Sequence, residues 1–219
     1  MSQTLFSRFN LALWAALAMV TLAGFVLVPA NALLPVHWGP SGEADSFWPR
    51  NAALAIAPVM VAANAAIFAL VGRFAPAEQL AAGKHVWAIV VPAISALALA
   101  VQGGIVLIGT GYPDRMVRII SLGFAVMLIL LGNVLPKTQP NRLAGLRLPW
   151  MTAEPAHWRA TQRLTGILFM LGGMGLLLCG LLVDEAQWLA VALVAAVLVP
   201  TVVGGFYGCL YGHRPAQGR

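Results

Sequence analysis

Long apolar stretches, each followed by a short polar segment, occupy most of the chain. A helix needs about 20 consecutive apolar residues to cross the bilayer core. The apolar residues run continuously instead of alternating, and lipid supplies no hydrogen-bond partner for the backbone, so helices are favoured over β-barrel strands. The pattern predicts an all-α protein, a polytopic membrane helix bundle with six transmembrane helices. The expected spans cover residues 9–28, 52–71, 85–108, 116–135, 164–183 and 188–210.

The composition supports this pattern and excludes a water-soluble globular protein. Of the 219 residues, 60% are hydrophobic and 9% are charged, and the mean hydropathy is +0.85. Soluble domains carry about 25% charged residues, far more than this chain could place on a surface in contact with water. Ala30-Asn31-Ala32 resembles a signal-peptidase site, but the apolar run before it is longer than that of a usual signal peptide, so we expect a retained span.

The positive charges are unevenly divided between the two sets of connections. With a cytoplasmic N-terminus, ten Lys and Arg residues fall on the inner side and three on the outer side. This is the positive-inside pattern, so we expect both termini in the cytoplasm, residues 31–50 outside and residues 136–163 inside. Membrane orientation thus explains the net charge of +6, and no direct nucleic-acid partner is expected. The inner cations are Arg8, Arg73, Lys84, Lys137, Arg142, Arg147, Arg159, Arg163, Arg214 and Arg219, and the outer ones are Arg50, Arg115 and Arg118.

The outer segment between the first two spans contains residue types suited to recognition. The simplest interpretation is a rigid Pro-Gly loop, in which Asp45 caps a turn and the tryptophans rest at the membrane interface. A second interpretation is a surface that recognises a ligand or a toxin. A third is metal or acid-base chemistry by His37, Glu43 and Asp45, but their spacing matches no strong metal motif, so we expect no metal and no cofactor. The candidate binding residues are His37, Trp38, Gly42, Asp45, Trp48 and Arg50.

The inner segment, residues 136–163, is basic and carries two tryptophans. Thr152 and Glu154-Pro155 can start a short amphipathic helix that leads to Trp158. The simplest interpretation is a positive-inside loop whose tryptophans rest at the interface. The alternative is a docking surface for a partner protein or for anionic headgroups. The candidate motif residues are Asn133, Pro136, Lys137, Asn141, Gly145, Arg147, Pro149, Trp150, Thr152, Trp158 and Arg163.

Three amide side chains lie within the expected spans, at Asn64, Gln102 and Asn133. Amides at such positions usually form hydrogen bonds across helices. No ionisable residue lies near the middle of a span, which argues against ion-coupled transport. A small membrane transporter or lipid-handling protein would need these three amides to line one water-filled cavity.

Small residues form a stripe on the sixth span, Gly204-x-x-x-Gly208-x-x-x-Gly212. We expect this stripe to pack against a neighbouring helix of the bundle in preference to a second subunit. The Gly172-Gly173-x-Gly175 cluster on the fifth span is its expected counterpart. The oligomeric state is left open.

The inner segment resembles the signature of the SdpI family of bacterial immunity membrane proteins. That signature runs from a Gly-Asn-hydrophobic-Pro-Lys element through Asn-x-x-x-Gly-x-Arg-x-Pro-Trp to a basic-Gly helix start. The family often carries His before the final basic residue, where this chain has Gln162, and Thr152 falls one place late. The matching residues are Gly132, Asn133, Pro136, Lys137, Asn141, Gly145, Arg147, Pro149, Trp150, Thr152, Trp158, Arg163 and Gly166.

The outer segment is similar to a small two-helix domain of unknown function that often precedes the SdpI region. This similarity rests on Leu34-Pro35-x-His37-Trp38, Gly42, Asp45 and Trp48-x-Arg50. We therefore divide the chain into a two-helix unit, residues 1–84, and an SdpI-like four-helix region, residues 85–219.

The resemblance implies a multi-pass protein of the bacterial cytoplasmic (inner) membrane that gives immunity to a secreted, membrane-active peptide toxin. It also implies signal transduction, in which an ArsR-like repressor is held at the membrane. The toxin would meet the outer side and the repressor the inner side, with the lipid bilayer around the helices. No catalytic motif is present, so no enzyme is expected. A membrane-bound hydrolase or metal enzyme built on the outer segment is the remaining alternative.

Overall fold

The computed structural model describes residues 2–148 and 154–212. Within them, six helices are long and apolar enough to cross a membrane, which confirms the predicted fold class. These are α2 (Arg8–Leu27), α3 (Arg50–Phe74), α5 (Lys84–Gly109), α6 (Met116–Val134), α7 (Pro155–Leu182) and α8 (Ala186–Gly212). The short elements are α1 (Ser2–Leu5), α4 (Ala77–Ala82) and the 3-10 turn η1 (Leu135–Lys137). The motif residues Pro149, Trp150 and Thr152 lie outside the described residues.

Helix α7 begins at Pro155, nine residues before the expected start of the fifth span at residue 164. Proline is favoured at a first helical position because its missing N–H needs no partner there. The added turns carry polar side chains that are nevertheless buried, such as Thr161 and Gln162. Hydropathy marks only the part of a helix at lipid depth, so the sequence pattern places these turns in the loop. The expected short helix at Glu154-Pro155 is the first part of α7.

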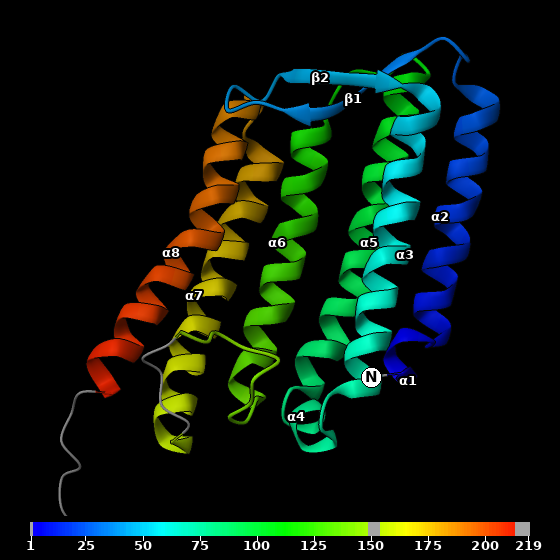
Figure 1. Ribbon diagram of the computed structural model, residues 1–219. Coiled ribbons are helices and arrows are strands. Elements are labelled where there is room, and N and C mark those ends of the chain that lie inside the picture. Colours follow the sequence, from blue (N-terminus) through cyan, green and yellow to red (C-terminus); the bar gives the residue numbers. More distant parts are fainter. Residues whose placement is uncertain (1, 149–153, 213–219) are drawn as a thin grey trace, which may run out of the picture.

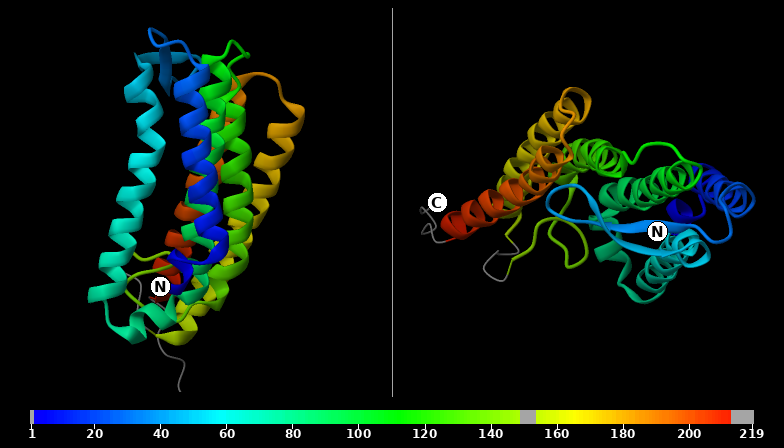
Figure 2. Two further views of the ribbon diagram at one scale, coloured as in Figure 1. Left: turned by 90° about the vertical axis from the view of Figure 1, so that its right-hand side faces the viewer. Right: turned by 90° about the horizontal axis from the view of Figure 1, so that it is seen from above.

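The helices form two groups that meet at α5 and α6 (Figures 1 and 2). One group contains α2, α3 and α5, and the other contains α6, α7 and α8. Helix α5 packs against both α2 and α6, so the proposed division into residues 1–84 and 85–219 stays a prediction. The first residues of α2 and the last of α8 lie at the same end, opposite the connection between α2 and α3.

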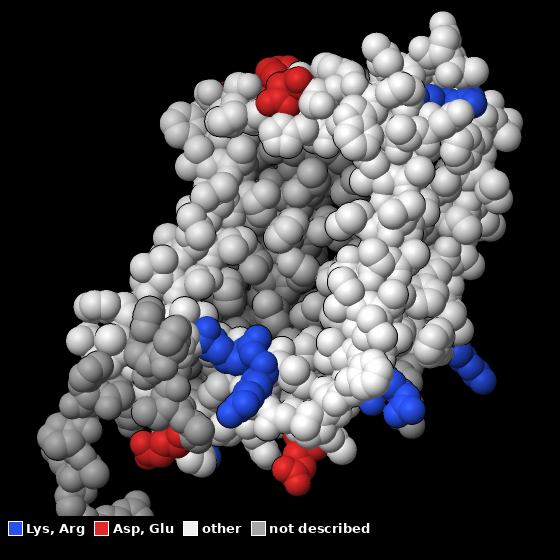
Figure 3. Space-filling model, in the orientation of Figure 1, with Lys and Arg blue, Asp and Glu red and all other residues white. Residues whose placement is uncertain are grey.

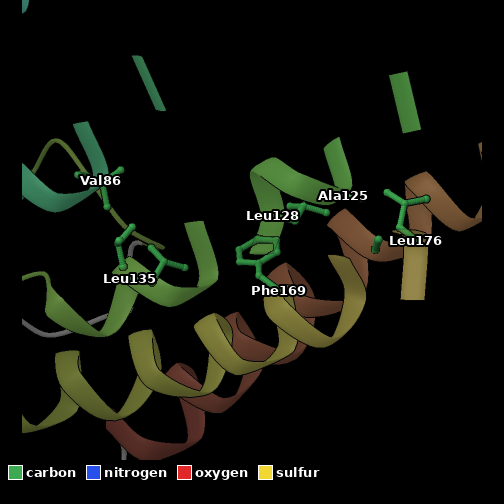
Figure 4. Packing of buried hydrophobic residues seen from close by; sticks show 9 residues of the cluster. Val86, Ala125, Leu128, Leu135, Phe169 and Leu176 are labelled. Atoms are coloured by element: carbon green, nitrogen blue, oxygen red, sulfur yellow. The ribbon is translucent and has the colours of Figure 1, made fainter. Parts of the chain in front are cut away.

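Buried apolar side chains join the helices of each group. In the second group, Leu128 on α6 and Phe169 on α7 belong to one cluster with Ala125 and Leu176 (Figure 4). Burying side chains of this size contributes about 1.5–3 kcal/mol each in water, but in lipid close packing carries more of the stabilisation. The second cluster joins the first group to the outer connection, through residues such as Leu34 and Leu54.

Glycines allow close approach between α6, α7 and α8. A Cβ atom at Gly173 would lie 2.8 Å from the carbonyl oxygen of Ala125 on α6, and one at Gly172 would lie 3.1 Å from that of Ala196 on α8. A Cβ atom at Gly204 would overlap Thr165 of α7. Gly172, Gly173 and Gly204 therefore pack inside the bundle, as expected, whereas Gly175 faces open space.

The outer connection is a β-hairpin, where the sequence analysis expects a rigid Pro-Gly loop without strands. Strands β1 (Leu33–Trp38) and β2 (Ala44–Pro49) pair antiparallel, with a register irregularity after Pro35. The hairpin lies across the end of the bundle, from the α2–α3 side toward α8 (Figures 1 and 2). The two short strands carry two prolines, Pro35 and Pro49. Apolar and polar residues do not alternate along β1, where the adjacent Leu34 and Pro35 are both buried.

The three amides of the spans do not come together. Gln102 is buried and donates across helices to the carbonyl of Leu54 at 3.0 Å, as expected for a membrane amide. Asn64 instead donates to Met60 within α3 at 2.8 Å, and Asn133 is exposed at the inner end of α6. Asn64 lies ten residues beyond Leu54 on α3, about 15 Å along the helix. This arrangement does not provide the shared cavity that the transporter alternative requires.

Candidate functional site

Trp38 attaches the hairpin to the helix bundle. Its indole Nε1 donates to Asp114 Oδ2 at 2.8 Å, and the other oxygen of Asp114 accepts from the backbone N–H of Met116 at 2.9 Å. Asp114 thus binds the hairpin and satisfies an N–H at the start of α6 at the same time. Trp38, expected as a ligand-binding residue, is in this structure an attachment point for the hairpin.

The Arg50 side chain, at the start of α3, caps the C-terminal end of helix α2. Its guanidinium donates to the carbonyls of Val28 at 2.9 Å and Phe25 at 3.2 Å, and it lies over the Phe25 ring at 5.6 Å. The last carbonyls of a helix lack partners within the helix and carry partial negative charge, so a cation stabilises them. Arg50 therefore joins the start of α3 to the end of α2, and this contact leaves it little freedom to bind a ligand.

His37 and Asp45 form a pair on the exposed surface of the hairpin. Nδ1 of His37 lies 2.6 Å from Oδ1 of Asp45, and their side chains are 69% and 51% exposed. Asp45 lies in β2 and contacts His37, so the expectation that it caps a turn is corrected. Glu43 does not join the pair, and within residues 2–148 and 154–212 no three His, Cys, Asp or Glu side chains are arranged to hold a metal ion.

The hairpin also exposes apolar side chains. Trp48 is 47% exposed, Phe47 52% and Leu33 65%. His37 and Asp45 are exposed as well, whereas Phe47 and Trp48, consecutive in β2, point to opposite sides of the strand.

A cavity of about 450 Å³ lies where the hairpin tip meets the helix bundle. Gly42 at the tip has a φ of +82° and approaches Ala186 so closely that a Cβ atom would overlap the start of α8. The buried side chains of Met116 and Leu189 contribute apolar lining, and Asp114, Arg115, Arg118 and Asp184 contribute charge. We call this cavity the outer pocket.

The charges of the outer pocket are mostly engaged. Arg118 donates to the carbonyl of Val183 and to Asp184 Oδ1, both at 2.7 Å, and so ties α6 to the α7–α8 turn. Asp114 accepts from two N–H groups. This site could not be predicted from the sequence, because nothing local along the chain indicates that the α5–α6 turn and the α7–α8 turn lie together. Of the predicted outer residues, only Gly42 lines it.

The inner motif begins with a turn shaped by Asn141. Its Oδ1 accepts from the N–H groups of Leu143 and Ala144 at 2.8 and 2.6 Å, and its Nδ2 donates to the carbonyl of Gln139 at 2.7 Å. Such side-chain bonds to nearby backbone replace helix or sheet hydrogen bonds. Gly145 follows with a φ of +100°, a conformation that favours glycine.

Two buried side chains of α7 hold this turn in place. The Gln162 amide accepts from the N–H of Leu146 at 3.0 Å and donates to its carbonyl at 2.7 Å. Trp158 is 4% exposed, and its indole donates to Thr138 Oγ1 at 3.0 Å. The expectation that Trp158 rests at the membrane interface is therefore wrong, because the loop folds over it. Gln162, noted as a departure from the family signature, is one of the central contacts.

The inner segment packs beside α7 and α8. Leu146 approaches Gly204, and Leu148 approaches Gly205, so each leucine occupies space that a larger residue on α8 would fill. Arg147, which lies between them, is exposed. We call residues 141–148 the inner wedge.

The inner motif thus contains two kinds of residue. Asn141, Gly145 and Trp158 have structural roles, since they shape the turn or hold it in place. Gly132 also has a structural role, because a Cβ atom there would overlap the carbonyl oxygen of Gly166. The basic residues are exposed, and Lys and Arg side chains gather near this end of the molecule (Figure 3). The exposed cations of the motif region are Lys137, Arg142, Arg147, Arg159 and Arg163.

Comparison with known proteins confirms the resemblance to the SdpI family. Residues 137–208 match the family model described as the SdpI/YfhL protein family. The chain is also 26% identical over 123 residues to Immunity protein SdpI of Bacillus subtilis (strain 168), which covers 54% of this chain and 58% of that protein. The chain thus spans little more than half the length of this curated relative. No solved structure matches the chain. The protein is a multi-pass membrane protein with an SdpI-like region that includes the inner wedge, α7 and most of α8.

Proposed function

We propose that this protein is a non-enzymatic immunity protein of the bacterial cytoplasmic membrane, which binds a secreted, membrane-active peptide toxin at its outer face. The name of the relative supports the class of function. The observation that carries the binding site is the outer pocket under a hairpin tied to Asp114 and seated on Ala186. Its apolar floor at Met116 and Leu189 and its charged rim suit an amphipathic peptide, and the hairpin also exposes Phe47 and Trp48 farther along β2.

The test is survival of a toxin-sensitive host that expresses the full chain. We expect protection by the unaltered protein and its loss with Trp48→Ala or Arg115→Glu, which change the exposed surface without breaking a hydrogen bond between described residues. Leu178→Ala, on the exposed apolar face of α7, is the control and should protect fully. Unchanged killing of cells that hold normal amounts of the unaltered protein in the membrane, for every candidate peptide, would refute the immunity function.

We further infer that the inner face holds a cytosolic regulator of the ArsR-like type. The support is the set of exposed cations near the start of α7 and at η1, including Arg159 and Lys137. An acidic partner surface would complement them. If this is right, a candidate regulator will sediment with membranes that contain the chain, and Lys137→Glu with Arg159→Glu will release it. Retention of the regulator by this variant would contradict the inference.

A further inference from the structure

Arg147 is held in an unusual position by its two neighbours. Leu146 is bound to Gln162 through both backbone polar groups, and Leu148 packs on Gly205 of α8. These contacts fix the backbone on either side, while the Arg147 side chain is exposed. Within residues 2–148 and 154–212, no acceptor forms a hydrogen bond or an ion pair with its guanidinium.

The contacts of the inner wedge place Arg147 near the inner boundary of the hydrocarbon core. Gln162 lies seven residues inside the start of α7, about 10 Å along the helix. The 28 residues of α7 span about 42 Å, so in a hydrocarbon core of about 30 Å some 6 Å project at each end. Gln162 and the wedge bound to it therefore lie about 4 Å inside the inner boundary of the core. The long, exposed Arg147 side chain can extend from there to the inner-leaflet phosphates, where an unpaired guanidinium finds an anion.

The surface beside the wedge is hollowed. Figure 3 shows a depression between the α7–α8 side and the α3 side, with Lys and Arg side chains gathered at its inner end. Arg142 belongs to the same wedge and is exposed, and its backbone N–H donates to Gln79 Oε1 of α4 at 2.6 Å. The wedge thus runs from α4, on the α3 side of this depression, to α8 on the other side, and it carries two exposed cations.

We propose that Arg147 and Arg142 bind the phosphate of an anionic phospholipid of the inner leaflet, whose acyl chains occupy the depression. Arginine suits this ligand because its planar guanidinium can donate two parallel hydrogen bonds to phosphate oxygens. A lipid is favoured over an acidic protein because the wedge lies at the edge of the hydrocarbon core, where the Arg147 side chain reaches lipid phosphates, whereas a cytosolic protein meets the cations that project farther, at the start of α7. Phosphatidylglycerol and cardiolipin have the required chemistry, and neither carries a headgroup amine that two cations would repel.

The test uses the full chain in nanodiscs that contain phosphatidylcholine and a small fraction of phosphatidylglycerol, with bound lipid counted by mass spectrometry. The unaltered protein should retain phosphatidylglycerol in excess of its share in the disc. Loss of one cation near the membrane surface weakens anionic-lipid attraction by about fivefold, so Arg147→Gln should lower this excess by about that factor. Arg147→Lys keeps the charge without the planar fork and should lower it less.

Arg73→Gln is the matched control, because Arg73 is an exposed inner cation at the end of α3 and lies outside the wedge. Its phosphatidylglycerol excess should equal that of the unaltered protein. An equal decrease in both variants would indicate a general effect of positive charge and overturn the proposal. An unchanged phosphatidylglycerol excess in Arg147→Gln would also overturn the proposal. This holds even if the same variant no longer retains the cytosolic regulator. If Arg147→Gln does not fold, the single variant Arg142→Gln must still lower the phosphatidylglycerol excess.

Discussion

At the scale of single residues, Gln162 illustrates how a buried amide can replace a loop's missing backbone partners. It forms two hydrogen bonds with Leu146, one as donor and one as acceptor. An amide has a carbonyl oxygen and an NH2 group side by side, which match the N–H and C=O of one residue. Removing it leaves both backbone groups of Leu146 without that partner.

Gln162→Ala should therefore destabilise the protein by about 2–4 kcal/mol, since each buried polar group left unpaired costs about 1–3 kcal/mol. The measurement is the thermal unfolding midpoint of the purified protein in detergent. Gln187→Ala is the control, because Gln187 is exposed near the start of α8, and it should leave the midpoint nearly unchanged. Equal midpoints for the two variants would contradict the assignment of Gln162 as a structural contact.

Trp38 and Trp48 form a second contrast between residues that look alike in the sequence. Trp38→Phe removes the bond to Asp114 but keeps most of the ring, so the hairpin should open more often. Hydrogen exchange of the β1 and β2 amides, followed by mass spectrometry, should become about ten- to a hundredfold faster, because one hydrogen bond to a charged group contributes about 1.5–3 kcal/mol. Trp48→Phe, at an exposed position, should leave exchange unchanged. Protection that is the same in both variants would show that the hairpin does not depend on this bond.

At the scale of elements, the contact between α6 and α7 depends on glycines that face the partner helix. Gly173 faces the backbone of Ala125, whereas nothing lies within 4 Å of a Cβ atom at Gly175, two residues further on. Helices in membranes associate through such small residues, because lipid offers them no hydrophobic driving force.

Gly173→Ala should separate α6 and α7 and lower stability by about 1–3 kcal/mol, the usual cost of overpacking. Gly175→Ala places the same methyl group in open space and should be neutral or stabilising by up to about 1 kcal/mol, since alanine favours helix. The free energies of unfolding of the two variants are compared by titration with a denaturing detergent. A loss of stability that is equal at both positions would point to a general effect of the substitution and not to the α6–α7 contact.

At the scale of the whole molecule, the charge pattern and the fold together define two unlike ends. The hairpin and the outer pocket lie at one end, and the inner wedge and most cations lie at the other (Figures 1 and 3). The direction of the protein in the membrane follows from the positive-inside pattern and stays a prediction.

Cysteine labelling tests this orientation. In a background with Cys179→Ser and Cys209→Ser, Ser41→Cys at the hairpin tip should react with a membrane-impermeant maleimide on intact spheroplasts. Gln139→Cys, at an exposed inner position, should react only after the membrane is permeabilised. The reverse result would place the hairpin in the cytoplasm and remove the basis for toxin recognition at the outer pocket.

The sequence by itself determined the six spans, the helical fold class and the resemblance to the SdpI family. Hydropathy is a property of each segment alone, and a lipid environment leaves an apolar segment little choice but a helix. The motif spacing is likewise readable along the chain. These features needed no knowledge of which segments touch.

Only the tertiary structure decided what the motif residues do. The burial of Trp158 depends on the inner wedge, the attachment of Trp38 depends on Asp114 seventy-six residues away, and the outer pocket depends on two turns that meet at the hairpin tip. The early start of α7 has the same cause, since its polar turns are buried by partners distant in the chain. Contacts between distant segments assign these roles, and no local pattern of hydrophobic and polar positions encodes them.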